Sequence, residues 1–313
     1  MAQPVILDTD LGYHTDPDDA IALAYVLLQP DCDLLGVTTV GLRSDWRAEL
    51  AELICADLGR GDLPIVAGAD RPIGDTQYWF ENPVQPWPRE APDQPRRSYP
   101  PNRALDWLSQ TIRQAPGEIT LITIGQFTNL ATLLLADPEA AAMLKRVVSM
   151  GGRLQYPPDQ PKGECNVILD PLAAKIAFQR LGDALTLVPI DVVRGKPLTA
   201  DMLQTMLRPD AFQTVRAAAH GWQSSKGNRN IGLADPATVA FAFDPSLGRC
   251  QTGRLDVELY PHPLPAGEPF PAGQLTGATT FTPDPAGPHR VLAELDPDPA
   301  HAHIQSIFAY ADS

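Results

Sequence analysis

The stretch PVILDTDLGYHTDPDDAIALAYVLL, residues 4–28, decides the expected fold. Its first four residues form a short apolar run of the kind that becomes a buried strand, and residues 17–28 carry the apolar spacing of a helix. In a parallel α/β sheet, ligands bind beyond the carboxyl ends of the strands. Asp8 and Asp10, which follow the apolar run, are expected at such an end.

The same alternation of strand-like and helix-like segments continues along the chain. Further strands are expected at 34–40, 63–67, 119–124, 147–150 and 185–190, and further helices at 47–58 and 128–135. The pairs Asp137-Pro138 and Asp170-Pro171 indicate helix starts, because Asp suits the N-cap and Pro the first helical position. We therefore predict an open, mostly parallel, Rossmann-like α/β sheet with helices on both faces.

Two stretches interrupt this alternation. Residues 72–101 contain eight prolines and several aromatic residues, and a loop of this length is expected to be a lid or an interface. Residues 260–288 are rich in Pro and Gly and are interpreted as turns in a C-terminal, strand-containing extension. Because neither stretch resembles a linker, we expect one domain over residues 1–313.

Composition excludes some classes of function. The formal net charge of -14 argues against a nucleic-acid partner, since phosphate binding needs clustered Lys and Arg. No apolar run reaches the roughly 18 residues of a membrane span, and the N-terminus lacks the features of a signal peptide, so a cytoplasmic location is expected. Four cysteines without a C-x-x-C pair favour buried, reduced thiols: Cys32, Cys55, Cys165 and Cys250.

Five aspartates occur within twelve residues of the first segment. Helix capping and the helix dipole explain the last three, Asp16, Asp18 and Asp19. They do not explain Asp8 and Asp10, which end an apolar strand. Crowded carboxylates need a cation or shared protons. A hard, oxygen-seeking cation such as Ca²⁺ or Mg²⁺ fits such a cluster.

Six short motifs follow one another along the chain. They are Asp8, Asp10 and Gly12 with Asp18-Asp19-Ala20; Gly36-Val37-Thr38-Thr39-Val40; Ile124-Gly125-Gln126-Phe127-Thr128-Asn129-Leu130; Met150-Gly151-Gly152; Glu164-Cys165-Asn166 with Asp170-Pro171; and Asp235-Pro236. Single matches such as D-x-D are common, but six in this order are specific. Together they resemble the signatures of the inosine-uridine preferring nucleoside hydrolase family.

The resemblance implies a calcium-dependent cleavage of the N-glycosidic bond of a ribonucleoside. Its implied Ca²⁺ ligands are Asp10, Asp19, Asp235 and the backbone carbonyl of Ile124, with Asp8 supporting them. Its implied ribose ligands are Asp18, Glu164, Asn166 and Asp235. Asp10 is the implied general base, which takes a proton from a Ca²⁺-bound water. Ligands to the ribose hydroxyls imply a preference for ribose over deoxyribose. The family also implies a homodimer or homotetramer.

The chain departs from the family pattern where the leaving base is expected. Ala234 replaces the His that donates a proton to the base in many members, Arg43 stands in place of an Asn or Asp, and an early His-Gly segment is missing. Five residues are candidates for base binding or for the leaving-group acid: His14, Trp79, Trp87, His220 and Trp222. Stacking of a base on Trp, which activates purines in some relatives, favours a purine preference.

Three other functions remain open. The protein could hydrolyse a different riboside whose leaving group needs no His. Ala234 and Arg43 favour a metal- and ribose-binding family member with reduced or lost turnover. A D-x-D phosphohydrolase is the third alternative, but it lacks its expected downstream Lys and leaves Asp235-Pro236 unexplained.

Overall fold

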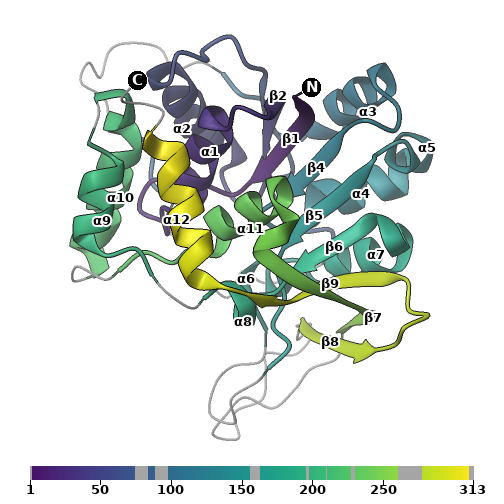
Figure 1. The fold of residues 1–313 in the computed structure, drawn as a ribbon. Helices are drawn as coiled ribbons and strands as arrows, with labels where there is room; N and C mark the ends of the chain where they lie inside the picture. Colours follow the sequence, from purple (N-terminus) through teal and green to yellow (C-terminus); the bar gives the residue numbers. More distant parts are fainter. Residues whose placement is uncertain are drawn as a thin grey trace, which may run out of the picture.

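The computed structural model describes residues 2–74, 84–88, 98–155, 163–194, 197–208, 210–226, 230–259 and 277–309. Their strands form one sheet in the order β3-β2-β1-β4-β5-β6-β9-β7-β8 (Figure 1). The strands are β1 (Gln3–Thr9), β2 (Cys32–Thr39), β3 (Ile65–Ala67), β4 (Thr120–Thr123), β5 (Arg146–Met150), β6 (Leu185–Val188), β7 (Gly248–Glu258), β8 (Ala278–Pro283) and β9 (His289–Leu295). All neighbours from β3 to β9 are parallel, whereas β7 is antiparallel to both β9 and β8. The predicted mostly parallel sheet with C-terminal strands is confirmed.

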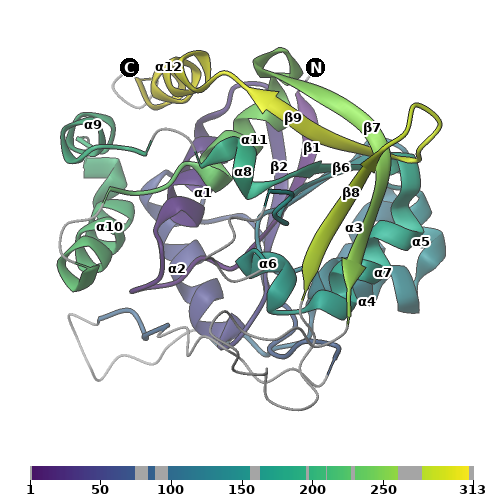
Figure 2. The same ribbon diagram turned by 90° about the horizontal axis from the view of Figure 1, so that it is seen from below.

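Helices cover both faces of this sheet, as Figure 2 shows. Successive side chains of β1 point to opposite faces of the sheet. Val5 and Leu7 pack in the core beneath one helical layer, and Ile6 packs in the core beneath the other layer. The first layer contains α1 (Asp18–Leu28), α2 (Ser44–Asp57), α8 (Ile190–Val193), α9 (Ala200–Met206), α10 (Gln213–Lys226), α11 (Ala234–Phe243) and α12 (Pro297–Phe308). The second contains α3 (Ala104–Gln114), α4 (Thr128–Ala136), α5 (Pro138–Ala142), α6 (Cys165–Ile168) and α7 (Pro171–Leu181).

Strand β1 lies at the point where the strand order reverses. Its neighbours are β2 on one side and β4 on the other. After β1 the chain adds β2 and β3 on one side, and it then returns to add β4, β5 and β6 on the other side. Doubly wound sheets open a crevice at the carboxyl ends of the strands that flank such a switch point. The turn after β4 is tight there, because a Cβ on Gly125 would lie 2.8 Å from the backbone nitrogen of Asp10. This backbone approach brings the ends of β1 and β4 together.

Both predicted Asp-Pro helix starts are confirmed. The carboxylate of Asp137 accepts a hydrogen bond from the backbone nitrogen of Ala140 at 3.2 Å, and that of Asp170 accepts one from Ala173 at 3.1 Å. Helix α2, by contrast, begins at Ser44 and not at residue 47. The backbone nitrogen and the hydroxyl of Ser44 both donate to Asp70, each at 2.8 Å, and this long-range contact cannot be read from local spacing.

Two further expectations are corrected or lie beyond the described residues. The stretch 260–288, interpreted as turns in a strand-containing extension, contains strand β8, while its residues 260–276 lie outside the description. Of the stretch 72–101, residues 75–83 and 89–97 lie outside it.

All four cysteines are free thiols, but only Cys55 is buried as expected: Cys32 and Cys250 are partly buried, and Cys165 is exposed. Over the described part of the chain, no helix is both long and apolar enough to cross a bilayer.

Candidate active site

A cavity of ≈ 480 Å³ opens at the carboxyl ends of the central strands, a volume suited to a small molecule. The loops after β1, β4 and β5 and the first turns of α1 and α11 contribute to its wall. It is lined by Asp10, His14, Thr15, Asp16, Asp18, Asp19, Ile124, Met150, Glu164, Cys165, Asn166, Leu169, Ile190, Trp222, Lys226, Ala234 and Asp235. Most of the residues predicted for the metal and the ribose therefore meet in one cavity, although they are far apart in the sequence.

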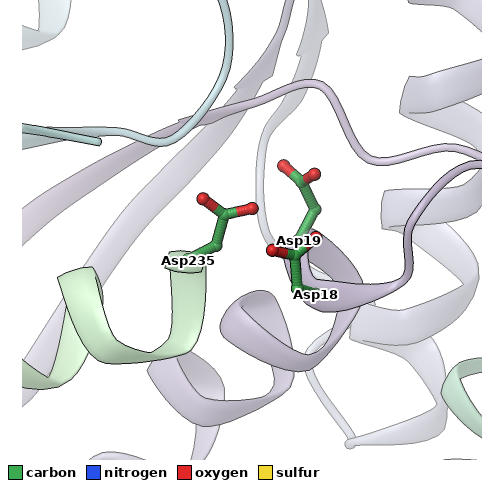
Figure 3. A group of neighbouring side chains, drawn as sticks. All are labelled: Asp18, Asp19 and Asp235. Carbon is green, nitrogen blue, oxygen red and sulfur yellow. The ribbon is translucent and has the colours of Figure 1, made fainter. Parts of the chain in front are cut away.

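Three carboxylates form the tightest acidic group of the cavity (Figure 3). One oxygen from each of Asp18, Asp19 and Asp235 lies within 4.8 Å of the others, and all three side chains are buried. Asp18 and Asp19 stand in the first turn of α1, and Asp235 stands in the first turn of α11. The positive ends of these two helix dipoles favour negative charge at this place.

The electrostatics of this group favour a cation. Burial raises the pKa of Asp18, Asp19 and Asp235 well above the ordinary value, and repulsion by neighbouring carboxylates, Asp10 among them, raises it further. Burial also raises the pKa of Asp10, which lines the cavity beside them. A donor set made only of carboxylate oxygens suits a hard divalent cation, and binding of such a cation would relieve the repulsion.

Arg47 is a charged residue near this cluster that sequence reasoning missed. Its side chain is fully buried and donates to the backbone carbonyls of Leu42 at 3.0 Å and Leu11 at 3.1 Å. Its positive charge lowers the pKa of Asp10 and Asp19, against the larger effect of their burial. The spacing in the sequence indicates this burial, because Arg47 lies on the same face of α2 as the buried residues Leu50, Ala51 and Ile54.

Glu164 and Asn166 line the cavity from the turn that begins α6. The two oxygens of Glu164 accept hydrogen bonds from the backbone nitrogens of Asn166 at 2.9 Å and Gly152 at 2.8 Å. Burial nevertheless raises the pKa of Glu164 to about 7. The amide nitrogen of Asn166 donates to the backbone carbonyls of Ile124 at 2.8 Å and Met150 at 3.3 Å. These contacts hold both side chains in place at the cavity.

Asp8 lies beneath the cavity and does not line it. Its Oδ1 accepts hydrogen bonds from the hydroxyl of Thr38 and from the amide of Asn129, the latter at 2.7 Å, while its buried Oδ2 contacts no donor. Burial raises the pKa of Asp8 to about 7. Asn129 also accepts from the backbone nitrogen of Ala69 at 2.8 Å, so Asp8 belongs to a buried network that ties β1, β2 and α4 to the loop after β3.

The candidates for base binding separate into two groups. His14, whose backbone has a left-handed φ of 69°, and Trp222 of α10 both line the cavity. His220 is exposed and does not line it, and Trp87 packs against Tyr13 with ring centroids 4.9 Å apart, also away from the lining. Trp79 lies outside the described residues. Lys226, not considered from the sequence, lines the cavity one helical turn after Trp222.

The two departures from the family pattern have different surroundings. Ala234 lines the cavity and brings no proton donor to it. Arg43 does not line it: its guanidinium pairs with Asp45 at 2.7 Å and stacks 3.5 Å from the ring centroid of Trp46. Arg43 therefore makes contacts on its own helix, and it supplies no ligand to the cavity.

Comparison with known proteins finds relatives of similar length. A pyrimidine-specific ribonucleoside hydrolase RihA from Shewanella sp. (strain MR-7) is 30% identical over 273 residues, which covers 82% of this chain and 83% of that protein. A RihA from Salmonella arizonae is 29% identical and covers 79% and 81% of the two chains. Among solved structures, a purine-preferring ribonucleoside hydrolase from Gardnerella vaginalis superposes with a TM-score of 0.78, at 24% identity and over 99% of both chains.

The family model of the inosine-uridine preferring nucleoside hydrolases matches residues 5–300, nearly the whole chain. The match spans all six motifs that carry the resemblance, and each motif contributes at least one residue to the cavity or to the hydrogen-bond network of Asp8. The chain belongs to the inosine-uridine preferring nucleoside hydrolase family and is an N-glycosyl hydrolase of that family.

Proposed function

We propose that the protein hydrolyses the N-glycosidic bond of a purine ribonucleoside to ribose and free base, with Ca²⁺ bound by Asp10, Asp19, Asp235 and the carbonyl of Ile124. The observation that carries the proposal is the group formed by Asp18, Asp19 and Asp235, whose buried carboxylates lie within 4.8 Å of one another. Asp10 and Ile124 line the same cavity but do not belong to that group. When bound, Ca²⁺ supplies a positive charge that orients the water and the ribose hydroxyls and makes the water more acidic.

Asp10 is the proposed general base. It lies on the wall of the cavity, immediately after β1, where its carboxylate can accept a proton from the attacking water. Burial raises its pKa, which brings its basicity closer to neutral pH than that of an exposed aspartate. The negative charges of the cluster also stabilise the positive charge that develops on the ribose as the bond breaks.

Asp18, Glu164 and Asn166 are the proposed ribose ligands. The amide nitrogen of Asn166 is engaged by the carbonyls of Ile124 and Met150, so its oxygen remains available to accept from a ribose hydroxyl. Buried acceptors that lose their partners are costly, so a 2′-deoxyribonucleoside is expected to react more slowly.

Trp222 is the proposed stacking partner of the base, and His14 is the proposed donor to the leaving base. Both line the cavity, and the ring of Trp222 is almost completely buried there. A purine presents the larger face to an indole, which is the reason for the proposed purine preference. The RihA relatives at 28% to 30% identity are named pyrimidine-specific, so a pyrimidine ribonucleoside is the second candidate substrate.

The decisive experiment measures reducing sugar released from inosine, guanosine, adenosine, uridine and cytidine by protein freed of metal with EDTA and then supplied with Ca²⁺. We expect purine ribonucleosides to release reducing sugar only when Ca²⁺ is added, and 2′-deoxyinosine to release it more slowly. Faster release from uridine and cytidine would overturn the purine preference only. Full release without any divalent cation would overturn the role of the metal, and metal binding without release from any riboside would favour a binding protein.

A further inference from the structure

The hydroxyl of Thr9 lies buried against the acidic cluster. Thr9 is the last residue of β1 and is completely inaccessible to solvent. Its Oγ1 donates a hydrogen bond to Oδ1 of Asp19 at 2.6 Å. The backbone nitrogen of Asp10 points to the same oxygen at 3.2 Å. Oδ1 of Asp19 is therefore held by two donors from the end of β1.

The direction of the Thr9 bond follows from its second contact. The backbone nitrogen of Leu11 donates to Oγ1 of Thr9 at 3.2 Å, so the hydroxyl acts there as an acceptor. A hydroxyl carries one hydrogen, which is then available only to Asp19. A buried carboxylate oxygen that accepts two hydrogen bonds is both oriented and stabilised as an anion.

We infer that Thr9 is a positioning residue of the cation site: its hydroxyl holds Asp19 by Oδ1 and so leaves Oδ2 oriented for the divalent cation. The inference rests on the proposed Ca²⁺ site. Thr9 itself does not line the cavity, so the inference gives it no direct contact with substrate or cation. It acts through Asp19, and its contribution is to lower the cost of bringing that carboxylate into ligating geometry.

A purely structural role for Thr9 would have different consequences. The backbone carbonyl of Thr9 accepts from the nitrogen of Val40 at 3.1 Å, a contact of the sheet that any side chain preserves. Loss of the hydroxyl for structural reasons alone would lower the stability of metal-free and metal-loaded protein equally. A positioning role predicts a larger loss in the metal-loaded protein, because Asp19 then binds the cation less well.

The test is calorimetric titration of Ca²⁺ into metal-free protein, with thermal unfolding measured at zero and saturating Ca²⁺. Thr9→Val removes the hydroxyl at nearly constant volume, Thr9→Ser keeps it, and Thr39→Val is the matched control. Thr39 is the last residue of β2, equally buried, and its hydroxyl donates to the carbonyl of Ser44 at 2.8 Å, outside the cavity lining. We expect Thr9→Val to weaken Ca²⁺ affinity about tenfold, the value of one lost hydrogen bond to a charged group. Thr9→Ser is expected within about threefold of wild type, and Thr39→Val unchanged in affinity.

The outcomes separate this inference from the proposed function. If wild-type protein binds Ca²⁺ and Thr9→Val binds it equally well or more tightly, the role of Thr9 is overturned and the metal site stands. An equal loss in Thr39→Val would also overturn it, because the effect would then be general to the strand ends. If wild-type protein binds no divalent cation, both proposals fail. Should Thr9→Val not fold, Thr9→Cys, with a similar volume and only a weak donor, is expected to bind Ca²⁺ several-fold more weakly, and wild-type affinity there overturns the inference.

Discussion

The side-chain amide of Asn166 donates a hydrogen bond to the backbone carbonyl of Ile124 at 2.8 Å. This contact joins a residue proposed to bind the ribose to a carbonyl proposed to bind the cation. A carbonyl oxygen has two lone pairs, so Ile124 can accept from Asn166 and still offer an acceptor to the cavity. We therefore expect the two proposed subsites to be coupled, since a change at Asn166 would alter the hydrogen bond to that carbonyl.

Asn166→Asp tests this coupling. The substitution places an acceptor where the amide nitrogen donates to Ile124 and Met150, and the resulting repulsion between oxygens is expected to displace the side chain. We expect kcat/KM for a ribonucleoside to fall by about 10-fold to 100-fold, a loss of roughly 1–3 kcal/mol in transition-state binding. Ca²⁺ affinity, measured by titration, is expected to change as well. A variant with lower kcat/KM and unchanged Ca²⁺ affinity would show that the two subsites are independent.

Asp10→Asn tests the general base. Asparagine keeps the shape of the side chain but cannot accept a proton from water, so kcat is expected to fall by about 10²-fold to 10⁴-fold. Asp33→Asn is the control, because Asp33 is an exposed residue of β2 that does not line the cavity. Steady-state kinetics at saturating Ca²⁺ compare the two variants. Turnover of Asp10→Asn within threefold of wild type would rule out the assignment of the base.

Asp8→Asn tests the buried network beneath the cavity. Burial raises the pKa of Asp8 from 3.8 in the unfolded chain to about 7 in the folded protein. The folded state therefore binds the proton more tightly, so Asp8 contributes stability at low pH that is lost as the pH rises from about 4 to 7. Asparagine keeps an oxygen for Thr38 and Asn129 and does not titrate.

The measurement is chemical denaturation in EDTA at pH 5 and pH 8. The free energy of unfolding of wild type, relative to that of Asp8→Asn, is expected to fall by about 3 kcal/mol between the two pH values. Other carboxyl groups of the site titrate in both proteins, so their contributions cancel in the comparison. A difference that stays constant with pH would mean that Asp8 is ionised throughout this range.

Removal of the metal is expected to destabilise the protein more at pH 8 than at pH 5. Burial and mutual repulsion raise the pKa values of Asp18, Asp19 and Asp235, so protons compete with a cation at the lower pH. At pH 8 the ionised carboxylates repel one another unless a cation is bound. The readout is the difference in Tm between protein in Ca²⁺ and in EDTA. An equal shift at the two pH values would contradict ligation by these carboxylates.

His14→Ala distinguishes the proposed leaving-group donor from its alternative. His14 lines the cavity and His220 is exposed outside the lining, so only the first substitution is expected to lower kcat for inosine, by about 10²-fold or more. With 4-nitrophenyl riboside, whose leaving group needs no proton, both variants are expected to react like wild type. If His14→Ala slows both substrates equally, His14 shapes the cavity and does not donate the proton.

Part of the order of strands and helices, up to β6 and α7, was predictable from the sequence because it depends on local patterns. Apolar runs predicted β1, β2, β4, β5 and β6, and the Asp-Pro pairs predicted the starts of α5 and α7 to the residue. The start of α2 could not be predicted in this way, because Ser44 donates hydrogen bonds to Asp70 of a distant loop. Strand β8 escaped prediction for a related reason: it is defined by its pairing with β7, and not by its own composition.

For the site, the sequence alone determined which residues carry carboxylates and where the strands that bear them end. Only the tertiary structure decided which of them meet: Asp235 joins Asp18 and Asp19 because α11 packs on α1, whereas Asp8, only two residues from Asp10, turns into a buried network. It also decided that Arg47 lies close enough to Asp10 and Asp19 for its charge to act on them, and that His220 lies outside the cavity. The physical reason is that spacing along a chain sets the direction of a side chain, while its neighbours are set by the packing of elements that are distant in sequence.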